Sequence, residues 1–174
     1  MTHPAEGLAQ RLGDAVVERA EFRDELTLVV GRERILQALD TARGEGFRLL
    51  TDLTAVDRHP AQPRFEVVYL LTSPEQRARV RLKVRVAAED AVVPSATGGW
   101  PAANWLEREV FDLFGIRFDA HPDLQRILMP DDWEGHPLRK DYPLVEEPVQ
   151  FVGHTPKVPS QIIPSSKPPH HRPG

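Results

Sequence analysis

Cysteine is absent from this chain of 174 residues, which excludes disulfide bonds and excludes thiolate ligation of zinc or iron–sulfur clusters by the chain itself. Long hydrophobic runs are missing too: no stretch of about 18 or more apolar residues is present, so the sequence predicts no helix that spans a bilayer. The segment from Met1 to Pro4 has neither a basic flank nor an apolar stretch, and we expect no signal peptide. These absences favour a chain that is soluble by itself and cytoplasmic.

Signatures of catalysis are equally scarce. The sequence has no Gly-rich phosphate-binding loop, no Gly-x-Ser-x-Gly turn and no His-x-x-x-His pair. The formal net charge of −4 gives no general attraction to nucleic acid or to an anionic membrane. With 40% hydrophobic and 28% charged residues, the composition is that of an ordinary globular domain.

The order of helical and strand-like patterns predicts an α+β fold. Apolar residues recur at helical spacing around Leu8, around Ile35 and after Pro101, and short strand-like runs lie between these segments. The last helix is expected to end at Phe114, because Gly115 suits the left-handed turn that closes a helix. The predicted order α-β-β-α-β-β-β-α favours a mostly antiparallel sheet with helices on one face. The expected strands cover residues 15–22, 26–30, 47–56, 65–71 and 79–86. The expected segments are a core domain of residues 1–115, an extended interaction arm of residues 116–144 and a proline-rich, largely irregular tail of residues 145–174.

One of the predicted strands is strongly basic. Its residues alternate, so every second side chain points to the same face at a spacing of about 6.8 Å. Two interpretations stay open: a solvated face whose charges prevent edge-to-edge aggregation, or a surface that docks an acidic partner, because like charges this close repel one another. Nucleic acid is the weakest interpretation, since the chain is net acidic and the strand lacks aromatic residues. The cations on this face are Arg77, Arg79, Arg81, Lys83 and Arg85.

The helix before Gly115 carries a carboxylate among apolar residues. Glu109 lies between Leu106 and Leu113 on the same predicted helical face. A carboxylate on such a face is costly unless a donor satisfies it, so we expect Glu109 to bind an arginine of the arm. The alternative is an acid–base pair of Glu109 and Asp112, but no nucleophile accompanies them.

The arm combines large side chains with prolines and shows no sustained period. Its X-Pro steps favour extended backbone, which leaves backbone groups unpaired unless the segment lies against another surface. Trp133, Arg139 and Tyr142 are of the residue types that anchor interfaces, and Arg126 or Arg139 is the expected partner of Glu109. The histidines and carboxylates of the arm match neither a helical zinc pair nor a calcium loop, so we expect no metal site.

Three segments carry a resemblance to a known family. The residues from Trp100 to Ile116 and from Glu134 to Tyr142 are similar to the signature of the 30 kDa (C-type) subunit of respiratory complex I, and Phe47 to Asp57 resembles the central strand of that family. The similarity is ungapped over most of the chain from Phe47 to the end of the arm. Gln125 departs from it, since the family usually has a basic residue or proline there, although Arg126 keeps a cation next to it.

The resemblance implies a non-catalytic peripheral-arm subunit of a proton-translocating NADH-quinone oxidoreductase, which passes electrons from NADH through FMN and iron–sulfur clusters to quinone. In that family the subunit packs beside the quinone-site subunit (the 49 kDa, D-type subunit) and its cluster-bearing neighbours, binds no cofactor and no metal itself, and lies peripherally on the cytoplasmic face of the inner membrane. The resemblance therefore implies protein partners and no nucleic acid. The residues expected at the partner interface are Glu107, Arg108, Glu109, Asp112, His121, Asp123, Arg126, Asp132, Trp133, His136, Arg139, Lys140, Asp141 and Tyr142.

Two alternatives remain open. The first is an equivalent subunit of a membrane-bound hydrogenase or of a ferredoxin- or deazaflavin-dependent quinone oxidoreductase, because members of the same family occur in such complexes. The second is a free-standing binding module or a hydrolase that uses the histidines and carboxylates of the arm.

Overall fold

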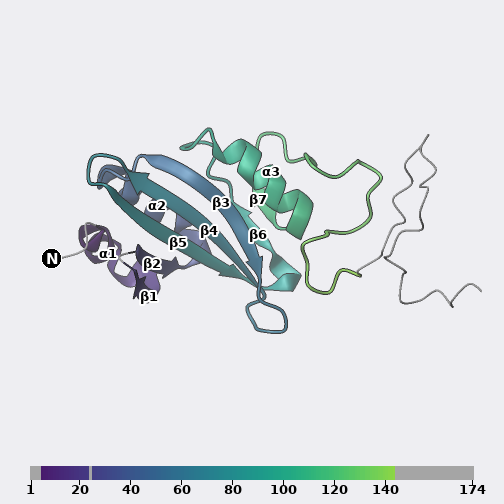
Figure 1. The fold of residues 1–174 in the computed structure, drawn as a ribbon, viewed down its shortest axis with the longest axis horizontal. Helices are drawn as coiled ribbons and strands as arrows, with labels where there is room; N and C mark the ends of the chain where they lie inside the picture. Colours follow the sequence, from purple (N-terminus) through teal and green to yellow (C-terminus); the bar gives the residue numbers. More distant parts are fainter. Residues whose placement is uncertain (1–4, 24, 144–174) are drawn as a thin grey trace, which may run out of the picture. The chain divides into compact units, whose positions relative to one another are not determined.

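The computed structural model describes residues 5–23 and 25–143, which form three α-helices, a five-stranded sheet and a small two-stranded sheet (Figure 1). The helices are α1 (Glu6–Leu12), α2 (Ile35–Gly44) and α3 (Ala103–Phe114). The strands of the main sheet are β1 (Val16–Phe22), β2 (Glu25–Val30), β3 (Leu49–Asp57), β4 (Phe65–Ser73) and β5 (Ala78–Val86). The small sheet consists of β6 (Val92–Pro94) and β7 (Arg117–Asp119). The expected tail of residues 145–174 lies outside the described residues.

The main sheet has the strand order β1-β2-β5-β4-β3. Its pairings are antiparallel except for β2 with β5, which is parallel. Strands β4 and β5 pair from Phe65 with Val86 to Ser73 with Ala78 without a shift in register, so alternate residues of both strands share a face. The prediction of an α+β fold with a mostly antiparallel sheet is confirmed.

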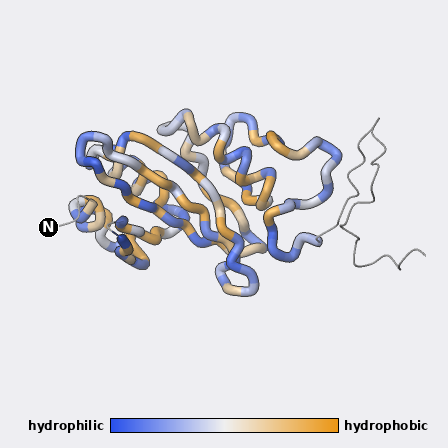
Figure 2. Tube along the Cα trace, in the orientation of Figure 1, coloured by the Kyte–Doolittle hydropathy of each residue, from blue (hydrophilic) through white to orange (hydrophobic). Residues whose placement is uncertain are grey.

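One face of the sheet carries the hydrophobic core. Leu53 of β3 and Tyr69 of β4 lie opposite each other in register and are buried on this face. All three described helices contribute to the same buried cluster, through Leu8 of α1, Leu39 of α2 and Val110 of α3. Figure 2 shows the resulting pattern, in which apolar positions gather in the strands and helices and alternate with polar ones. The expected placement of the helices on one face of the sheet is therefore confirmed.

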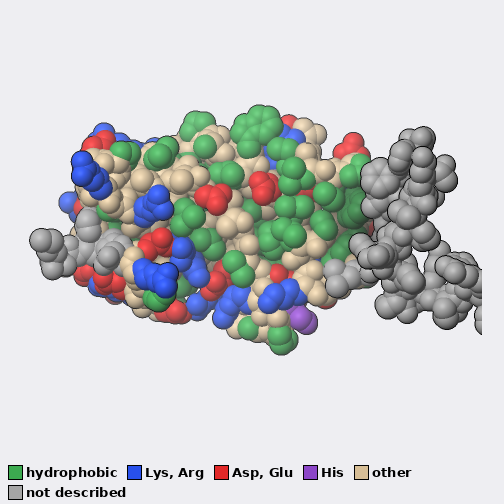
Figure 3. All heavy atoms as spheres, viewed as in Figure 1, with side chains coloured by type: hydrophobic (Ala, Val, Ile, Leu, Met, Phe, Trp, Pro, Cys, Tyr) green, Lys and Arg blue, Asp and Glu red, His purple; other side chains and the backbone are tan. Residues whose placement is uncertain are grey.

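The other face of β5 carries the basic residues, and most of them are neutralised within the chain. Arg81 forms an ion pair with Glu25. Lys83 Nζ and Arg85 Nε lie 3.0 and 2.8 Å from the two carboxylate oxygens of Glu66, which is buried between them. Figure 3 shows the same mixture on the viewed face, with basic and acidic side chains beside one another. This compensation removes the repulsion that motivated a docking surface, so the structure supports the solvated interpretation of the strand.

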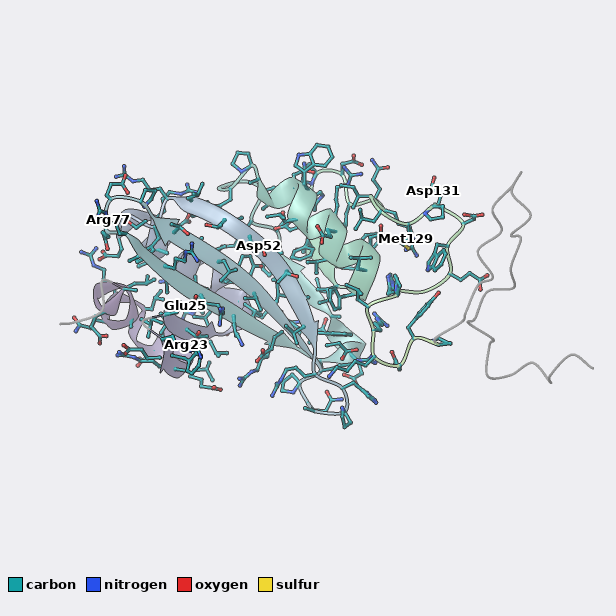
Figure 4. All side chains as sticks on the ribbon, viewed as in Figure 1. Arg23, Glu25, Asp52, Arg77, Met129 and Asp131 are labelled. Atoms are coloured by element: carbon teal, nitrogen blue, oxygen red, sulfur yellow. The ribbon has the colours of Figure 1, made fainter. Side chains whose placement is uncertain are left out.

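Two of the five expected cations do not take part in this network. Arg77 precedes β5 and has a φ of 50°, so it does not share the strand face. Figure 4 places it at the end of the sheet away from the arm. Arg79 is exposed and forms no ion pair with any of the described residues.

The small sheet of β6 and β7 was not expected from the sequence. Each strand has three residues, which is too short to show an alternating pattern. Val93 pairs with Phe118, and both side chains are buried in the core. The first residues of the segment expected to be an extended arm therefore form a strand of the core. The backbone N–H of Ser95 donates to the carbonyl oxygen of Asp119 at 2.8 Å, which holds the loop after β6 next to the start of the remaining arm.

Candidate functional site

From residue 120 to residue 143 the arm runs alongside α3 and around its C-terminal end without forming a helix or a strand (Figure 1). Figure 4 shows Met129 and Asp131 on the part of the arm that passes beside α3. The arm is nevertheless bound to the core by its main chain. For example, the N–H of Leu138 donates to the carbonyl oxygen of Leu113 at 3.1 Å. Irregular backbone of this kind is stable only where such groups find partners.

Asp112 of α3 is the main attachment point of the arm. Its side chain is fully buried, and Oδ1 accepts a hydrogen bond from Arg126 Nη1 at 2.6 Å. Oδ2 accepts three backbone N–H groups, from Ile127, Leu128 and Met129, at 2.8–3.0 Å. Burial alone would raise the pKa of Asp112, but these backbone donors and Arg126 outweigh it and leave the pKa below its ordinary value. A charged Asp112 therefore fixes the bend of the arm at these residues.

The expectation that Glu109 anchors the arm is wrong. Glu109 is exposed, whereas Glu107 and Asp112 are fully buried. Arg126 pairs with Asp112, and Arg139 forms no ion pair with any described carboxylate. The reason is that α3 is covered on two sides, by the core and by the arm, so the buried set is not the single stripe that the apolar spacing suggested. The buried residues of α3 are Ala103, Glu107, Val110, Asp112 and Phe114.

A second attachment point ties the end of the arm to the sheet. Arg64 lies between Asp57 and Asp141 and donates two hydrogen bonds to each carboxylate, at 2.6–3.0 Å. Asp57 Oδ2 also accepts the backbone N–H of Lys140 at 2.8 Å. The hydrogen bonds from Arg64 hold the pKa of Asp57 well below its ordinary value, although burial opposes them. Paired, two-point contacts of this kind are among the strongest that arginine makes.

Asp57 and Arg64 were missed as site residues. Both sit at strand ends beside a proline-containing loop, where charged residues are usually solvated. No spacing in the sequence indicates that Asp141, which is 77 positions from Arg64, lies against them. The expected site residue Asp141 is thus bound by Arg64, a residue that the sequence did not suggest as its partner.

The arm makes two consecutive tight turns from His136 to Tyr142, and the second of them includes Lys140 and Asp141 of the second attachment point. The N–H of Arg139 donates to the carbonyl oxygen of His136 at 3.2 Å, and that of Tyr142 to the carbonyl oxygen of Arg139 at 3.0 Å. The turns are bound to the end of α3, because Arg139 Nε donates to the carbonyl oxygen of Phe114 at 2.6 Å and His136 Nδ1 to that of Asp112 at 2.8 Å. Burial lowers the pKa of His136, which favours the neutral ring.

Glu107 forms a separate buried cluster on the core side of α3. Ser95 Oγ and the N–H of Ala96 each donate to its carboxylate at 2.7 Å. His121 Nε2 lies 3.9 Å from the same carboxylate, and both side chains have an exposed fraction of 0%. Burial raises the pKa of Glu107 to about 7, although the hydrogen bonds from Ser95 and Ala96 oppose the shift. Glu107 therefore holds the loop after β6 against α3.

The same cluster lacks the arrangement of a hydrolase. His121 Nδ1 accepts the N–H of Asp123 at 3.0 Å, so the ring proton is on Nε2, which lies 3.2 Å from the carbonyl oxygen of Asn104. Neither ring nitrogen is free to take a proton from Ser95, whose hydroxyl already donates to Glu107. A serine without an adjacent base is not an activated nucleophile.

The remaining expected interface residues differ in exposure. Asp123, Asp132 and the side chain of Lys140 are exposed, while Arg108, Trp133 and Tyr142 are partly buried. Arg108 donates to the carbonyl oxygens of Gln125 and Arg126, which adds a third attachment of the arm. The arm also exposes two leucines that the sequence did not single out, Leu128 at 56% and Leu138 at 51%.

Among residues 5–23 and 25–143, no three His, Cys, Asp or Glu side chains are grouped so that they could hold a metal ion. The helices in the described part of the chain are all too short or too polar to cross a membrane.

Comparison with known proteins gives the family. Residues 28–148 match the sequence profile of the respiratory-chain NADH dehydrogenase, 30 Kd subunit. The chain belongs to this family. The matched span contains β3 to β7, α3 and the entire arm, so the family sequence includes every attachment point described above.

Relatives in the family match most of this chain. The C-type subunit of the NADH-quinone oxidoreductase of Roseiflexus sp. (strain RS-1) is 51% identical over 150 residues, which cover 84% of this chain and 86% of the relative. The corresponding NADH-quinone oxidoreductase subunit of Trichlorobacter lovleyi is 52% identical over 141 residues, which cover 80% of this chain and 87% of the relative.

Two solved structures are similar as well. A trypsin-resistant fragment of Nqo5 is 40% identical, with a TM-score of 0.55, and the similarity covers 57% of this chain and 83% of the fragment. A chain of the membrane-bound sulfane sulfur reductase, an archaeal respiratory membrane complex, is 27% identical, with a TM-score of 0.71, and the similarity covers 81% of this chain and 84% of that one.

Proposed function

We propose that this chain is a structural subunit of a proton-translocating NADH-quinone oxidoreductase, in which it packs beside the quinone-site subunit through its arm. The observation that carries the proposal is the family match across residues 28–148, which covers the arm as well as the domain on which the arm is built. In this assembly the chain lies on the cytoplasmic face of the membrane and touches the membrane only through its partners.

The construction of the arm supports a role in assembly. A segment that is already fixed before binding loses less conformational entropy when a partner docks, which favours affinity. Asp112 and Asp57 fix the two ends of this segment through charged hydrogen bonds. The arm then presents the exposed Leu128 and Leu138 to a partner, and the exposed Asp132 lies between them in the chain. Apolar contacts within a polar rim are typical of protein interfaces.

The redox chemistry belongs to other subunits in this proposal. The chain has no cysteine to ligate an iron–sulfur cluster. FMN, the clusters, NADH and quinone are then bound by its partners, and no residue of this chain acts as a catalytic residue.

A second candidate is an equivalent subunit of a related respiratory complex with another electron donor or acceptor. The similarity to a chain of the archaeal sulfane sulfur reductase complex favours it, because the same fold serves in a complex of that description.

One experiment separates these candidates. The tagged full-length chain is purified from membranes of its own organism under mild detergent, and the co-purifying subunits are identified. We expect an NADH-binding flavoprotein, cluster-bearing subunits and the quinone-site subunit, together with NADH-quinone activity. Recovery of a hydrogenase or sulfur-reducing module would favour the second candidate, and recovery of the chain alone in monodisperse form would overturn both. Metal and flavin analysis of the separated chain should find neither in stoichiometric amount.

A further inference from the structure

Four arginines lie in the arm or bind it. Three of them bind a carboxylate or two carbonyl oxygens, and the fourth, Arg139, binds a single carbonyl oxygen. Arg64 binds two carboxylates, Arg126 binds the carboxylate of Asp112, and Arg108 binds two carbonyl oxygens. Arg139 uses only Nε, which donates to a single carbonyl oxygen at the end of α3. Its two terminal nitrogens have no acceptor among the described residues, and no described carboxylate oxygen lies within 4.0 Å of them.

The guanidinium of Arg139 is held in place although its terminal nitrogens are unpaired. It lies over the ring of Phe65, 5.3 Å from the centroid. Its Nη2 also lies close to Gly115, where an added Cβ would approach it to 2.5 Å. The backbone of Arg139 is fixed by the two tight turns that join it to His136 and Tyr142. The group is therefore oriented before any partner arrives.

This position is unfavourable for a cation on its own. Partial burial lowers the pKa of Arg139, and the positive charge of Arg64 lowers it further, while Asp57 and Asp141 oppose the shift. A partly desolvated guanidinium with unpaired donors carries a cost that an added anion would remove.

We infer that Arg139 receives a carboxylate side chain of the neighbouring subunit in the assembled complex. The inference rests on the proposed function and names the contact that the arm makes. The two free nitrogens of Arg139 form a planar fork that matches the two oxygens of a carboxylate. Leu138, which precedes Arg139 in the chain, is exposed and would add apolar area to such a contact. The negative charges of Asp57 and Asp141 already act on Arg139, and they would repel an added anion. A singly charged carboxylate would be repelled less than a doubly charged phosphate and therefore fits this position better.

The test compares three variants of the full-length chain in the native complex: Arg139→Gln, Arg139→Lys and, as a control with the same loss of charge, Arg117→Gln. Arg117 is exposed in β7 and forms no ion pair within the described residues. The measured quantity is the rate at which each chain leaves the purified, diluted complex. Truncation of one member of a buried interfacial charge pair should speed dissociation about 30-fold or more for Arg139→Gln, whereas Arg117→Gln should dissociate as the unmodified chain does. Equal rates for Arg139→Gln and Arg117→Gln would overturn the inference.

A zero-length carbodiimide cross-link identifies the carboxylate. In the Arg139→Lys complex the reagent joins an amine only to a carboxylate in direct contact with it. A cross-link from position 139 to Asp or Glu of another subunit supports the inference, and it remains readable even if Arg139→Gln does not accumulate. A cross-link to a carboxylate of this same chain, or none, overturns it. If the unmodified chain brings down no respiratory subunits, the proposed function fails first. If it does and the Arg139 variants behave as the control, only the carboxylate contact fails.

Discussion

Replacing Asp112 by asparagine removes the negative charge on which Arg126 and three backbone N–H groups converge. Breaking a buried charge pair from one side costs about 3–5 kcal/mol, because the remaining charge is left uncompensated. The lower end applies here, since Arg126 keeps the carbonyl oxygens of Trp133 and Gly135 as acceptors. We therefore expect Asp112→Asn to lower the free energy of unfolding by about 3 kcal/mol and the Tm by roughly 6–12 °C.

The loss should begin in the arm. Urea unfolding of the full-length chain gives the total effect, and hydrogen exchange of the amides of Ile127, Leu128 and Met129 reports the local one. These amides should be protected in the unmodified chain and should exchange much faster in Asp112→Asn, because their acceptor has lost its charge. Glu109→Gln, an exposed change three positions away, should stay within about 0.5 kcal/mol of the unmodified chain. If Asp112→Asn unfolds like Glu109→Gln and its amides stay protected, the arm is not held by this carboxylate.

Three further predictions concern other parts of the chain. Burial raises the pKa of Glu107 from 4.5 to about 7. The protonated Glu107 side chain therefore contributes fully to the free energy of unfolding below pH 4.5, and this contribution is lost as the pH rises to about 7. Urea unfolding measured at pH values on either side of this range should show a loss of about 3 kcal/mol in the unmodified chain and none in Glu107→Gln. An equal loss in both chains would mean that Glu107 is not the group responsible. Arg85→Glu should lower the free energy of unfolding by about 1–3 kcal/mol, because it removes one of the two donors to the buried Glu66 and places a like charge beside it, whereas Arg79→Glu should change it by less than about 0.5 kcal/mol. Similar urea midpoints for these two variants would mean that the ion-pair network contributes nothing. Deleting residues 156–174, which have no periodic apolar face, should lower the Tm by less than about 5 °C; a larger drop in a thermal melt would mean that this segment packs on the core.

The sequence predicted most of the helices and main strands because their apolar residues recur at the spacing of a buried face; β1, whose residues are nearly all exposed, was predicted from its place before the turn to β2. Alternation from Arg79 to Val86 indicated β5, and Gly115, whose φ is 72°, indicated the end of α3. The parallel pairing of β2 with β5 could not be predicted, since it joins strands that are separated by two other strands and a helix. Periodicity reports which side of an element is buried and not which distant strand lies beside it.

The site was predicted less well than the fold. The arm and α3 were correctly expected to interact, but Glu109 was expected as the anchor instead of Asp112. A buried carboxylate is stable only where donors meet it, and three of the four groups that donate to the carboxylate of Asp112 are backbone N–H groups 15–17 positions away. Almost every residue carries a backbone N–H group, so the amino-acid sequence does not indicate which of these groups will bind a given carboxylate. The choice between the carboxylates of α3 therefore depended on the path of an irregular segment, which no local pattern encodes.

The second attachment point, which joins the end of the arm to the sheet, has a consequence for the order in which the domain folds. The backbone N–H of Lys140 reaches Asp57 across 83 positions of the chain. Contacts between positions this far apart form late, because closing a long loop costs entropy before any bond repays it. During synthesis β3 and β4 leave the ribosome long before the arm, so Asp57 and Arg64 first pair with each other and only later receive Asp141. We therefore expect the contact between the end of the arm and the sheet to form last, after the shorter-range contacts of the arm with α3, so that a partner that recognises the end of the arm in this position would accept only completely folded subunits.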